Sequence, residues 1–226
     1  MILVPVKNSA NAKQRLSAAL DQPTRTELAR TMLQDVLLAL AQFAHDVSLV
    51  TSDPFAIELA GNHGFGVIRD HRNLSETDAI GVATQVCISR CIEDTLVIPG
   101  DIPLIEAADV QAIYEHAPER GAVLVPSGDR RGTNAVLRRP ADLFPLRFGN
   151  DSFMPHLNAA VATGASCVVL ALPRIALDVD TPEDLAQLAN SDGERPSQLL
   201  ARRLVSSGWN SQRLADNSQR SSLAEL

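Results

Sequence analysis

The stretch TLVIPGDIP, Thr95 to Pro103, decides the fold class of this chain. Its apolar first half is typical of a strand that is buried on both faces of a sheet. Pro99 and Gly100 end the strand, and Gly100 permits a close backbone approach or an unusual dihedral angle. Asp101 follows at once, so a carboxylate stands at the carboxyl end of a central strand. In open parallel sheets, that edge is where ligands bind.

Further apolar runs indicate more strands, and helical patterns alternate with them. The predicted strands cover residues 2–6, 46–51, 66–69, 95–98, 122–126, 134–137 and 167–170. The predicted helices cover residues 24–43, 54–62, 77–90, 106–116 and 152–163, with a last helix at the end of LDVDTPEDL, Leu177 to Leu185. This alternation predicts an α/β fold, in which a mostly parallel sheet with right-handed crossovers is flanked by helices in a single domain.

The composition changes near Ser191 and divides the chain into two predicted parts. Residues 1–190 are expected to form the domain, with a mostly aliphatic core because hydrophobic residues make up 45% of the chain and aromatics only 4%. Residues 191–226 are rich in Ser, Gln, Asn and Arg and are expected to form a weakly ordered tail. Within that tail, Leu199 to Val205 could form one or two amphipathic turns that dock on a partner.

Charge and cysteine content exclude several classes of protein. The net charge of -7 argues against a general affinity for nucleic acid. The three cysteines suggest no disulfide framework, which favours a reducing cytosol. The sequence shows neither a leader pattern nor an apolar run of transmembrane length. We therefore expect a cytoplasmic protein without a nucleic-acid or membrane partner, and the sequence leaves a homodimer open.

Two further carboxylates stand in the segment LDVDTPEDL. Asp178 and Asp180 alternate on an extended segment, so their side chains point the same way and repel each other unless a cation lies between them. A hard divalent ion such as Mg²⁺ is the usual solution, with oxygen ligands and substrate phosphates around it. Asp180 or Thr181 could instead cap the following helix, and Asp101 could be a cap or turn residue. A helix cap would not explain Asp178.

Three cations follow the first predicted strand. Lys7, Lys13 and Arg15 lie in the loop of ILVPVKNSANAKQRL, Ile2 to Leu16, where they form either a solvated surface or a device that holds phosphates. The loop lacks GxxxxGK[ST] and GxGxxG, so neither a P-loop nor a dinucleotide-binding turn is indicated.

Two glycine-containing segments offer a site for an anion. RRGTN, residues 130–134, and RFGNDSF, residues 147–153, each join a glycine to a hydroxyl residue. Backbone N–H groups with Thr133 and Ser152 can bind a carboxylate or a phosphate, and Ser152 precedes a predicted helix whose N-terminus favours anions. Each segment taken alone is also compatible with a plain turn.

Together, the candidate carboxylates and cations meet at one edge of the predicted sheet. This combination suits the transfer of a nucleotidyl group, because cations and Mg²⁺ neutralise a triphosphate while an incoming phosphate oxygen attacks the α-phosphorus in line. The attacking phosphate is already ionised at neutral pH, so the reaction needs no general base.

The motifs ILVPVKN and AKQRL, VIPGDIPLI, RGTNAVL, FGNDSF followed by His156, and LDVDTPEDL occur in this order. In these segments, which span residues 1–188, the chain resembles the guanylyltransferases of deazaflavin coenzyme (F-420) biosynthesis. Members of that family join GMP from GTP to 2-phospholactate, phosphoenolpyruvate or 3-phosphoglycerate. The wider superfamily has the Rossmann-like nucleotide-diphospho-sugar transferase fold, in which the opening basic loop holds the phosphates of the nucleoside triphosphate.

The resemblance implies a role for each motif. Lys13 and Arg15 would contact the triphosphate and act in catalysis together with Asp101. The GTP site would further include Pro5, Val6, Lys7, Thr77 and Gly100. The carboxylates that would hold Mg²⁺, the expected cofactor, are Asp101, Asp178 and Asp180. The residues that would receive the carboxylate of the acceptor are Thr133, Gly149 and Ser152, and His156 would support this loop from one helical turn further on.

One segment departs from the family pattern. Many members carry Leu-Asn-x-Ala near the base, where this chain has Glu76-Thr77-Asp78-Ala79. Thr77 could keep a hydrogen bond, and Glu76 or Asp78 could accept from the N1 and N2 donors of guanine. Alternative functions are a nucleotidyltransferase of the same fold that acts on a sugar phosphate or a molybdopterin, a glycosyltransferase, and a catalytically silent nucleotide-binding protein.

Overall fold

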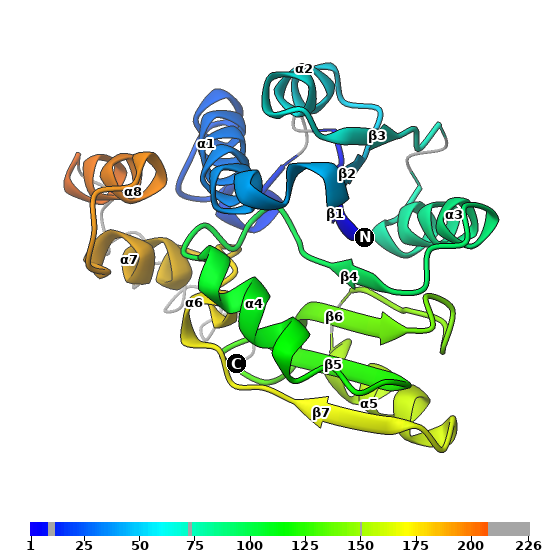
Figure 1. Ribbon diagram of the computed structural model, residues 1–226. Helices are drawn as coiled ribbons and strands as arrows, with labels where there is room; N and C mark the ends of the chain where they lie inside the picture. Colours follow the sequence, from blue (N-terminus) through cyan, green and yellow to red (C-terminus); the bar gives the residue numbers. More distant parts are fainter. Residues whose placement is uncertain (9–11, 72–73, 150, 208–226) are drawn as a thin grey trace, which may run out of the picture.

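Seven strands form one sheet in the order β3-β2-β1-β4-β6-β5-β7 (Figure 1). The computed structural model describes residues 1–8, 12–71, 74–149 and 151–207. The strands are β1 (Ile2–Pro5), β2 (Val47–Val50), β3 (Gly66–Ile68), β4 (Thr95–Val97), β5 (Gly121–Pro126), β6 (Thr133–Arg139) and β7 (Ser166–Val169). β6 runs antiparallel to β4 and β5, and the other pairings are parallel. The predicted mostly parallel α/β sheet is therefore confirmed.

The reversed direction of β6 decides which residues reach the site. Val97 at the end of β4 pairs with Val136 of β6. Because the two strands run in opposite directions, Thr133 and Asn134 at the start of β6 extend past the carboxyl end of β4. They therefore lie at the same sheet edge as Asp101, although they begin a strand.

Helices cover both faces of the sheet (Figure 1). One face packs against α1 (Gln22–Leu40), α2 (Pro54–His63) and α4 (Ala107–Glu115), and the other packs against α3 (Glu76–Ser89) and α5 (Phe153–Ala162). Successive residues of β1 alternate between the two cores, with Ile2 and Val4 on the α1 side and Leu3 on the α3 side. This alternation follows from the two-residue period of a strand and explains why the strand sequences are continuously apolar.

Local signals fix where the longest helices begin. The side chain of Asp21 accepts a hydrogen bond from the backbone N–H of Thr24 at 2.9 Å and so caps α1, with Pro23 in the first turn. The hydroxyl of Ser75 caps α3 in the same way by accepting from Asp78 N at 3.0 Å. The short helical segments are η2 (Gln14–Leu16), η3 (Ala41–Asp46) and α6 (Pro173–Ala176).

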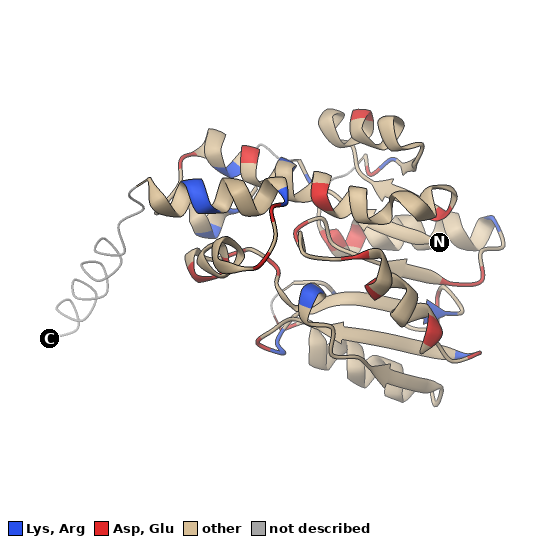
Figure 2. Cartoon of the chain, turned by 60° about the vertical axis from the view of Figure 1, so that its left-hand side comes forward, with Lys and Arg blue, Asp and Glu red and all other residues tan. Residues whose placement is uncertain are grey.

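A third apolar cluster lies beside the sheet and joins the opening loop to the last two described helices. It packs α1 against α7 (Pro182–Asn190) and α8 (Pro196–Ser206), which lie side by side in Figures 1 and 2. Leu16 of the opening loop is fully buried in it. Val179, the middle residue of the DVD segment (residues 178–180), is also fully buried there. The cluster therefore fixes two segments that carry candidate site residues.

The predicted weakly ordered tail is wrong for its first part. α8 is a regular helix that buries Leu200 and Ala201 against α1 and α7 of this chain. The packed unit thus extends past the expected boundary at residue 190. The remaining part of the predicted tail, residues 208–226, lies outside the described residues.

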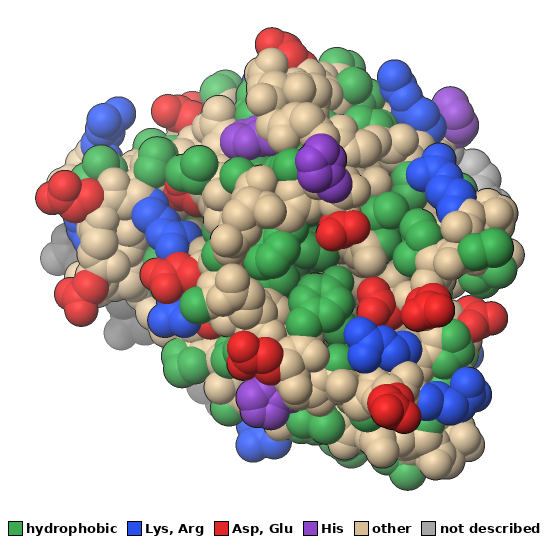
Figure 3. All heavy atoms as spheres, viewed as in Figure 1, with side chains coloured by type: hydrophobic (Ala, Val, Ile, Leu, Met, Phe, Trp, Pro, Cys, Tyr) green, Lys and Arg blue, Asp and Glu red, His purple; other side chains and the backbone are tan. Residues whose placement is uncertain are grey.

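The described surface carries charges of both signs. On the face shown in Figure 3, Lys and Arg side chains are intermixed with Asp and Glu. No helix in the described ranges combines the length and the apolar character needed to span a bilayer.

Candidate active site

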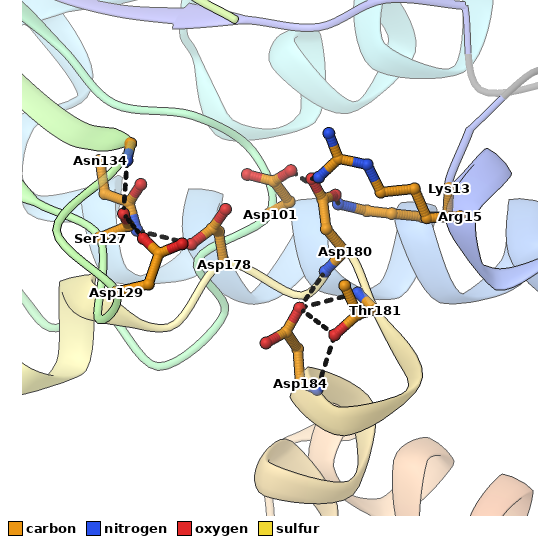
Figure 4. A network of polar contacts seen from close by, with 11 residues as sticks. Lys13, Arg15, Asp101, Ser127, Asp129, Asn134, Asp178, Asp180, Thr181 and Asp184 are labelled. Atoms are coloured by element: carbon orange, nitrogen blue, oxygen red, sulfur yellow. Dashed lines mark hydrogen bonds and ion pairs between the residues drawn. The ribbon is translucent and has the colours of Figure 1, made fainter. Parts of the chain in front are cut away.

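Lys13 joins two of the predicted carboxylates. Its Nζ donates to Asp101 Oδ2 at 2.6 Å and to Asp180 Oδ1 at 2.9 Å, as Figure 4 shows. The backbone of Lys13 has a positive φ of 53°, and η2 follows it directly. Leu16 of η2 is buried in the third cluster, which anchors the loop while Lys13 reaches back to the sheet edge. Residues far apart in the sequence thus meet as predicted.

The opposite charges of Lys13 and Asp180 shift the pKa values of these two residues in opposite directions. Burial alone would lower the pKa of Lys13, but the charges of Asp101 and Asp180 outweigh it and raise this pKa above its ordinary value. Burial would raise the pKa of Asp180, but the charge and hydrogen bond of Lys13 together with the charge of Arg15 outweigh burial and lower this pKa. Arg15 adds an ion pair to Asp180 with an N–O distance of 3.4 Å. Both shifts favour the charged forms of Lys13 and Asp180 at neutral pH.

Asp178 has a different neighbour. Its Oδ1 accepts a hydrogen bond from Asn134 Nδ2 at 3.0 Å, and the same amide group donates to the carbonyl oxygens of Ile175 and Ala176. In Figure 4 the carboxylates of Asp101, Asp178 and Asp180 lie next to one another, with Asn134 beside Asp178. Burial, opposed by the Asn134 hydrogen bond and reinforced by the neighbouring carboxylates, raises the pKa of Asp178.

The helix-cap alternative for Asp180 is wrong. Thr181 caps α7, because its side chain accepts from the backbone N–H of Asp184 at 3.3 Å. The Asp184 carboxylate reciprocates by accepting from Thr181 N at 2.7 Å and from Asp180 N at 3.1 Å. The capping box thus immobilises the backbone of Asp180 and leaves its carboxylate for Lys13 and Arg15.

The three carboxylates have the chemistry that Mg²⁺ requires, since this ion prefers oxygen ligands from carboxylates together with substrate phosphates. The described part of the chain contains no group of three or more His, Cys, Asp or Glu side chains arranged as a metal site. Instead, the ammonium of Lys13 lies between Asp101 and Asp180, whose side chains are 33% and 37% exposed. Their oxygens are therefore accessible, and the role of all three residues as Mg²⁺ ligands stays a prediction.

Two cavities meet at these carboxylates. The smaller has a volume of about 440 Å³ and the larger about 970 Å³. The residues that line both are Glu76, Pro99, Asp101 and Asp180. Each volume lies within or near the range of small-molecule sites, about 300–1,000 Å³. A substrate in one cavity would therefore face a substrate in the other across Asp101 and Asp180.

Most of the predicted nucleotide-binding residues line the smaller cavity. They are Pro5, Val6, Lys7, Lys13 and Gly100. Arg15 lines the larger cavity. Thr77 lines neither, because its hydroxyl accepts from Phe148 N at 2.9 Å and donates to Phe148 O at 3.3 Å, which ties α3 to the loop before α5.

The predicted acceptor-binding residues all line the larger cavity. They are Thr133, Gly149 and Ser152. Ser152 directly precedes α5, but its hydroxyl makes no cap for that helix and instead accepts from Thr133 N at 3.0 Å. Gly149 has a φ of +130°, which an L-amino acid with a side chain rarely adopts. Phe153 N also donates to Arg131 O at 2.9 Å, so the two glycine-containing loops are held together as one wall.

The sequence alone assigns no specific role to Asn134 or Phe55, and it leaves Glu76 and Asp78 as alternative partners for the guanine base. Asn134 belongs to the RRGTN motif, but only its contact with Asp178 reveals its role. Glu76 lines both cavities, and burial together with the nearby charge of Asp101 raises its pKa to about 7. Asp78, by contrast, accepts a hydrogen bond from the Ser75 hydroxyl at the start of α3. Phe55 lines the smaller cavity and stacks under the Arg30 guanidinium, 4.6 Å from the ring centroid.

A family model described as guanylyl transferase, CofC like, matches residues 1–205. The chain belongs to this family. The match extends through α8 as far as Val205, in agreement with the packing of that helix on α1 and α7.

Curated relatives of this CofC-like chain carry three different names. A phosphoenolpyruvate guanylyltransferase of Rubrobacter xylanophilus is 40% identical and aligns over 84% of this chain and 94% of the relative. A 2-phospho-L-lactate guanylyltransferase of Methanothermobacter thermautotrophicus is 33% identical over 82% of each chain. A 3-phospho-D-glycerate guanylyltransferase of Colwellia psychrerythraea is 30% identical over 83% of this chain and 90% of the relative.

Solved structures confirm the fold. A protein of Desulfovibrio desulfuricans G20, described as a candidate nucleotide-diphospho-sugar transferase, superimposes with a TM-score of 0.73 at 21% identity and covers 89% of this chain and 93% of its own. The predicted nucleotide-diphospho-sugar transferase-like fold is therefore confirmed for this CofC-like protein.

Proposed function

We propose that this protein is a Mg²⁺-dependent guanylyltransferase that transfers GMP from GTP to a small phosphorylated carboxylic acid and releases pyrophosphate. The acceptor is phosphoenolpyruvate, 2-phospholactate or 3-phosphoglycerate, and the reaction belongs to coenzyme F-420 biosynthesis. The observation that carries the proposal is the meeting of two cavities at Asp101 and Asp180, beside the Lys13 ammonium. The names of the relatives support the choice of GTP and of the acceptor class.

The smaller cavity is assigned to GTP. Its walls combine the backbone after β1 with Lys7 and Lys13, so it can hold a nucleoside whose phosphates point toward the carboxylates. Lys13 is held in place by Asp101 and Asp180, and it therefore presents a fixed positive charge at the junction. Arg15 approaches the junction from the other cavity. Fixed cations of this kind stabilise the charge of a triphosphate in the transition state.

The larger cavity is assigned to the acceptor acid. Thr133, Gly149 and Ser152 would hold its carboxylate, which places its phosphate toward Asp101. A phosphate oxygen attacks the α-phosphorus of GTP, a new P–O bond forms, and the bond to the bridging oxygen of the β-phosphate breaks. The leaving pyrophosphate carries the electron pair, and no proton is abstracted. Asp101, Asp178 and Asp180 would hold Mg²⁺, which neutralises phosphate charge and aligns the two substrates when bound.

An assay matrix tests this function. Each of the four nucleoside triphosphates is combined with each of the three acceptors, with and without Mg²⁺, and pyrophosphate and the product mass are measured. We expect product from GTP, one preferred acceptor and Mg²⁺. Absence of product from every combination would refute the proposal, and equal rates with all four nucleotides would refute the GTP assignment.

A substitution separates the metal role from folding. Asp101→Asn should abolish turnover while the thermal unfolding profile stays close to that of the wild type, because Asp101 is partly exposed and its change is isosteric. The matched control is Asp192→Asn, which alters an exposed aspartate outside both cavities. Unchanged turnover in Asp101→Asn would contradict the assignment of this carboxylate.

A further inference from the structure

His156 lies behind the wall of the acceptor cavity and is almost fully buried, with 1% of its surface exposed. It belongs to α5, one turn after Ser152. Its Nδ1 lies 3.0 Å from Thr133 Oγ1, and its Nε2 accepts a hydrogen bond from the backbone N–H of Arg147 at 2.8 Å. Phe148 packs edge-on against the ring, with 5.1 Å between the ring centroids. His156 does not line the cavity itself.

The Arg147 contact fixes the tautomer of this histidine. A backbone N–H can only donate, so Nε2 must carry a lone pair. A neutral imidazole with a lone pair on Nε2 carries its proton on Nδ1. Burial and the charge of Arg138 lower the pKa of His156 to about 4, so the ring is neutral at physiological pH. Nδ1–H therefore donates to Thr133 Oγ1.

Donation from His156 Nδ1–H determines where the hydrogen of the Thr133 hydroxyl can point. A threonine oxygen has two lone pairs and one hydrogen. One lone pair receives Nδ1–H of His156, and the hydroxyl of Ser152 donates to the same oxygen at 3.4 Å. The hydrogen of the Thr133 hydroxyl is then directed away from both neighbours, and Thr133 lines the larger cavity. Carboxylate and phosphate oxygens only accept hydrogen bonds, so a donor is what an anionic substrate requires.

We propose that His156 is a positioning residue that orients the Thr133 hydroxyl as a hydrogen-bond donor to the carboxylate of the acceptor acid. The inference rests on the proposed function, since it concerns the acceptor cavity of the same site. In this proposal His156 increases the affinity for the acceptor and also supports the loop before α5. GTP binds in the other cavity and does not depend on this hydrogen bond.

Two substitutions separate the two hydrogen bonds of the ring. The terminal amide of glutamine reaches the position of Nε2, so His156→Gln can keep the bond from Arg147 N but places no donor at Nδ1. The terminal amide nitrogen of asparagine branches from Cγ as Nδ1 does, so His156→Asn can keep the donor to Thr133. A hydrogen bond to a charged group is worth about 1.5–3 kcal/mol, and we therefore expect His156→Gln to raise the KM of the acceptor by about 10-fold or more.

The KM values of GTP and of the acceptor in these variants distinguish a positioning role of His156 from a merely structural one. The KM of GTP should stay within about twofold in His156→Gln, and His156→Asn should restore the acceptor KM to within about threefold of the wild type. The double variant His156→Gln/Thr133→Val should raise the acceptor KM no more than Thr133→Val alone, because each of the two changes removes the same interaction. The proposal would be overturned if the two substitutions multiplied their effects on the acceptor KM in the double variant. An equal rise in the KM of GTP in His156→Gln would also overturn it.

A measurement on the wild-type protein tests the tautomer of His156 without requiring a variant to fold and without an activity assay. The ¹⁵N chemical shifts and two-bond couplings of the His156 ring report its tautomer directly. We expect the Nδ1–H form. An Nε2–H form would refute this inference alone, whereas absence of guanylyl transfer in the wild-type assay would refute the proposed function.

Discussion

The backbone N–H of Val179 donates to the carbonyl oxygen of Asp101 at 3.2 Å. This bond joins the segment after β4 to the segment before α7, and it sets Asp178 and Asp180 on either side of the joined point. The side chain of Val179 is buried in the third apolar cluster, together with residues of α1, α7 and α8. The spacing of the three carboxylates therefore depends on the packing of α1, α7 and α8 beside the sheet.

The packing of α8 can be tested with two neighbouring leucines. Leu200 is 7% exposed and contributes to the third cluster, whereas Leu199 is 47% exposed. Leu200→Ala should lower the free energy of unfolding by about 2–5 kcal/mol, because it leaves a cavity beside α1 and α7. Urea denaturation followed by circular dichroism measures this change. Leu199→Ala is the control, and an equal loss in both variants would show that α8 is not packed as described.

Replacing Lys13 should weaken the nucleotide site selectively. Lys13→Met removes the charge between Asp101 and Asp180 while keeping much of the side-chain length. The lost contact to a charged group predicts a rise in the Kd of GTP of about 10–100-fold, measured by calorimetry with a non-hydrolysable analogue.

The control for this substitution is Lys7→Met, because Lys7 lines the same cavity but is exposed. Its effect on GTP binding should be smaller. Weakening of acceptor binding to the same degree as GTP binding in Lys13→Met would contradict the assignment of Lys13 to the triphosphate.

Asn134 should control the protonation of Asp178. The pKa of Asp178 is raised by burial, and the hydrogen bond from Asn134 opposes this rise. Asn134→Leu removes the opposing contact, so Asp178 would hold its proton to a higher pH. The acid limb of the pH–rate profile of kcat should therefore move to higher pH, with less activity at neutral pH. Asn158→Leu, at an exposed position of α5, serves as the control, and an unmoved acid limb in Asn134→Leu would exclude this role.

The buried His156 predicts a stability that depends on pH. Its pKa in the folded protein is lowered to about 4 from an ordinary value of 6.5, by burial and by Arg138. The unfolded chain thus binds a proton more tightly, so the stabilisation is fully present above pH 6.5 and is lost as the pH falls toward 4. The difference corresponds to about 3 kcal/mol at most.

Denaturation at several pH values measures this slope. His156→Gln should reduce the loss of unfolding free energy between pH 6.5 and 4, whereas the same substitution at the exposed His45 should leave it in place. A slope that is identical in the wild type and in His156→Gln would show that this ring does not stay neutral in the folded state.

The sheet could be predicted because its strands are short apolar runs, most of them buried on both faces. Such runs look alike wherever they occur in a parallel sheet, and each one ends at a polar or glycine-containing segment. Asp101 and the DVD segment were recognisable for the same reason, since their carboxylates stand where strands or extended segments reach the site edge. The contacts of Lys13 with Asp101 and Asp180 then agree with the predicted meeting of cations and carboxylates.

Other features depend on tertiary contacts that composition does not reveal. α8 carries many Ser, Gln and Arg residues, and its narrow apolar face gains its partner only when α1 and α7 are in place. Thr77 has the right residue type for a ligand contact, but both of its hydrogen bonds go to Phe148. The direction of the Thr133 hydroxyl follows from a backbone N–H of Arg147, a group that every residue except proline possesses.

The single reversed strand has a consequence for how the acceptor preference can change. Thr133 pairs with Pro126 at the start of β6, next to an irregularity in the ladder at Asn134, whereas residues 127–129, 131–132 and 148–149 border the same cavity as connecting segments. One contact for the acceptor carboxylate, Thr133, is thus part of the sheet, whereas much of the remaining wall of the cavity belongs to connecting turns. Exchanging these turns between relatives that use different acids should move the preference among acceptors without rebuilding the sheet, which makes loop grafting the natural engineering route for this enzyme.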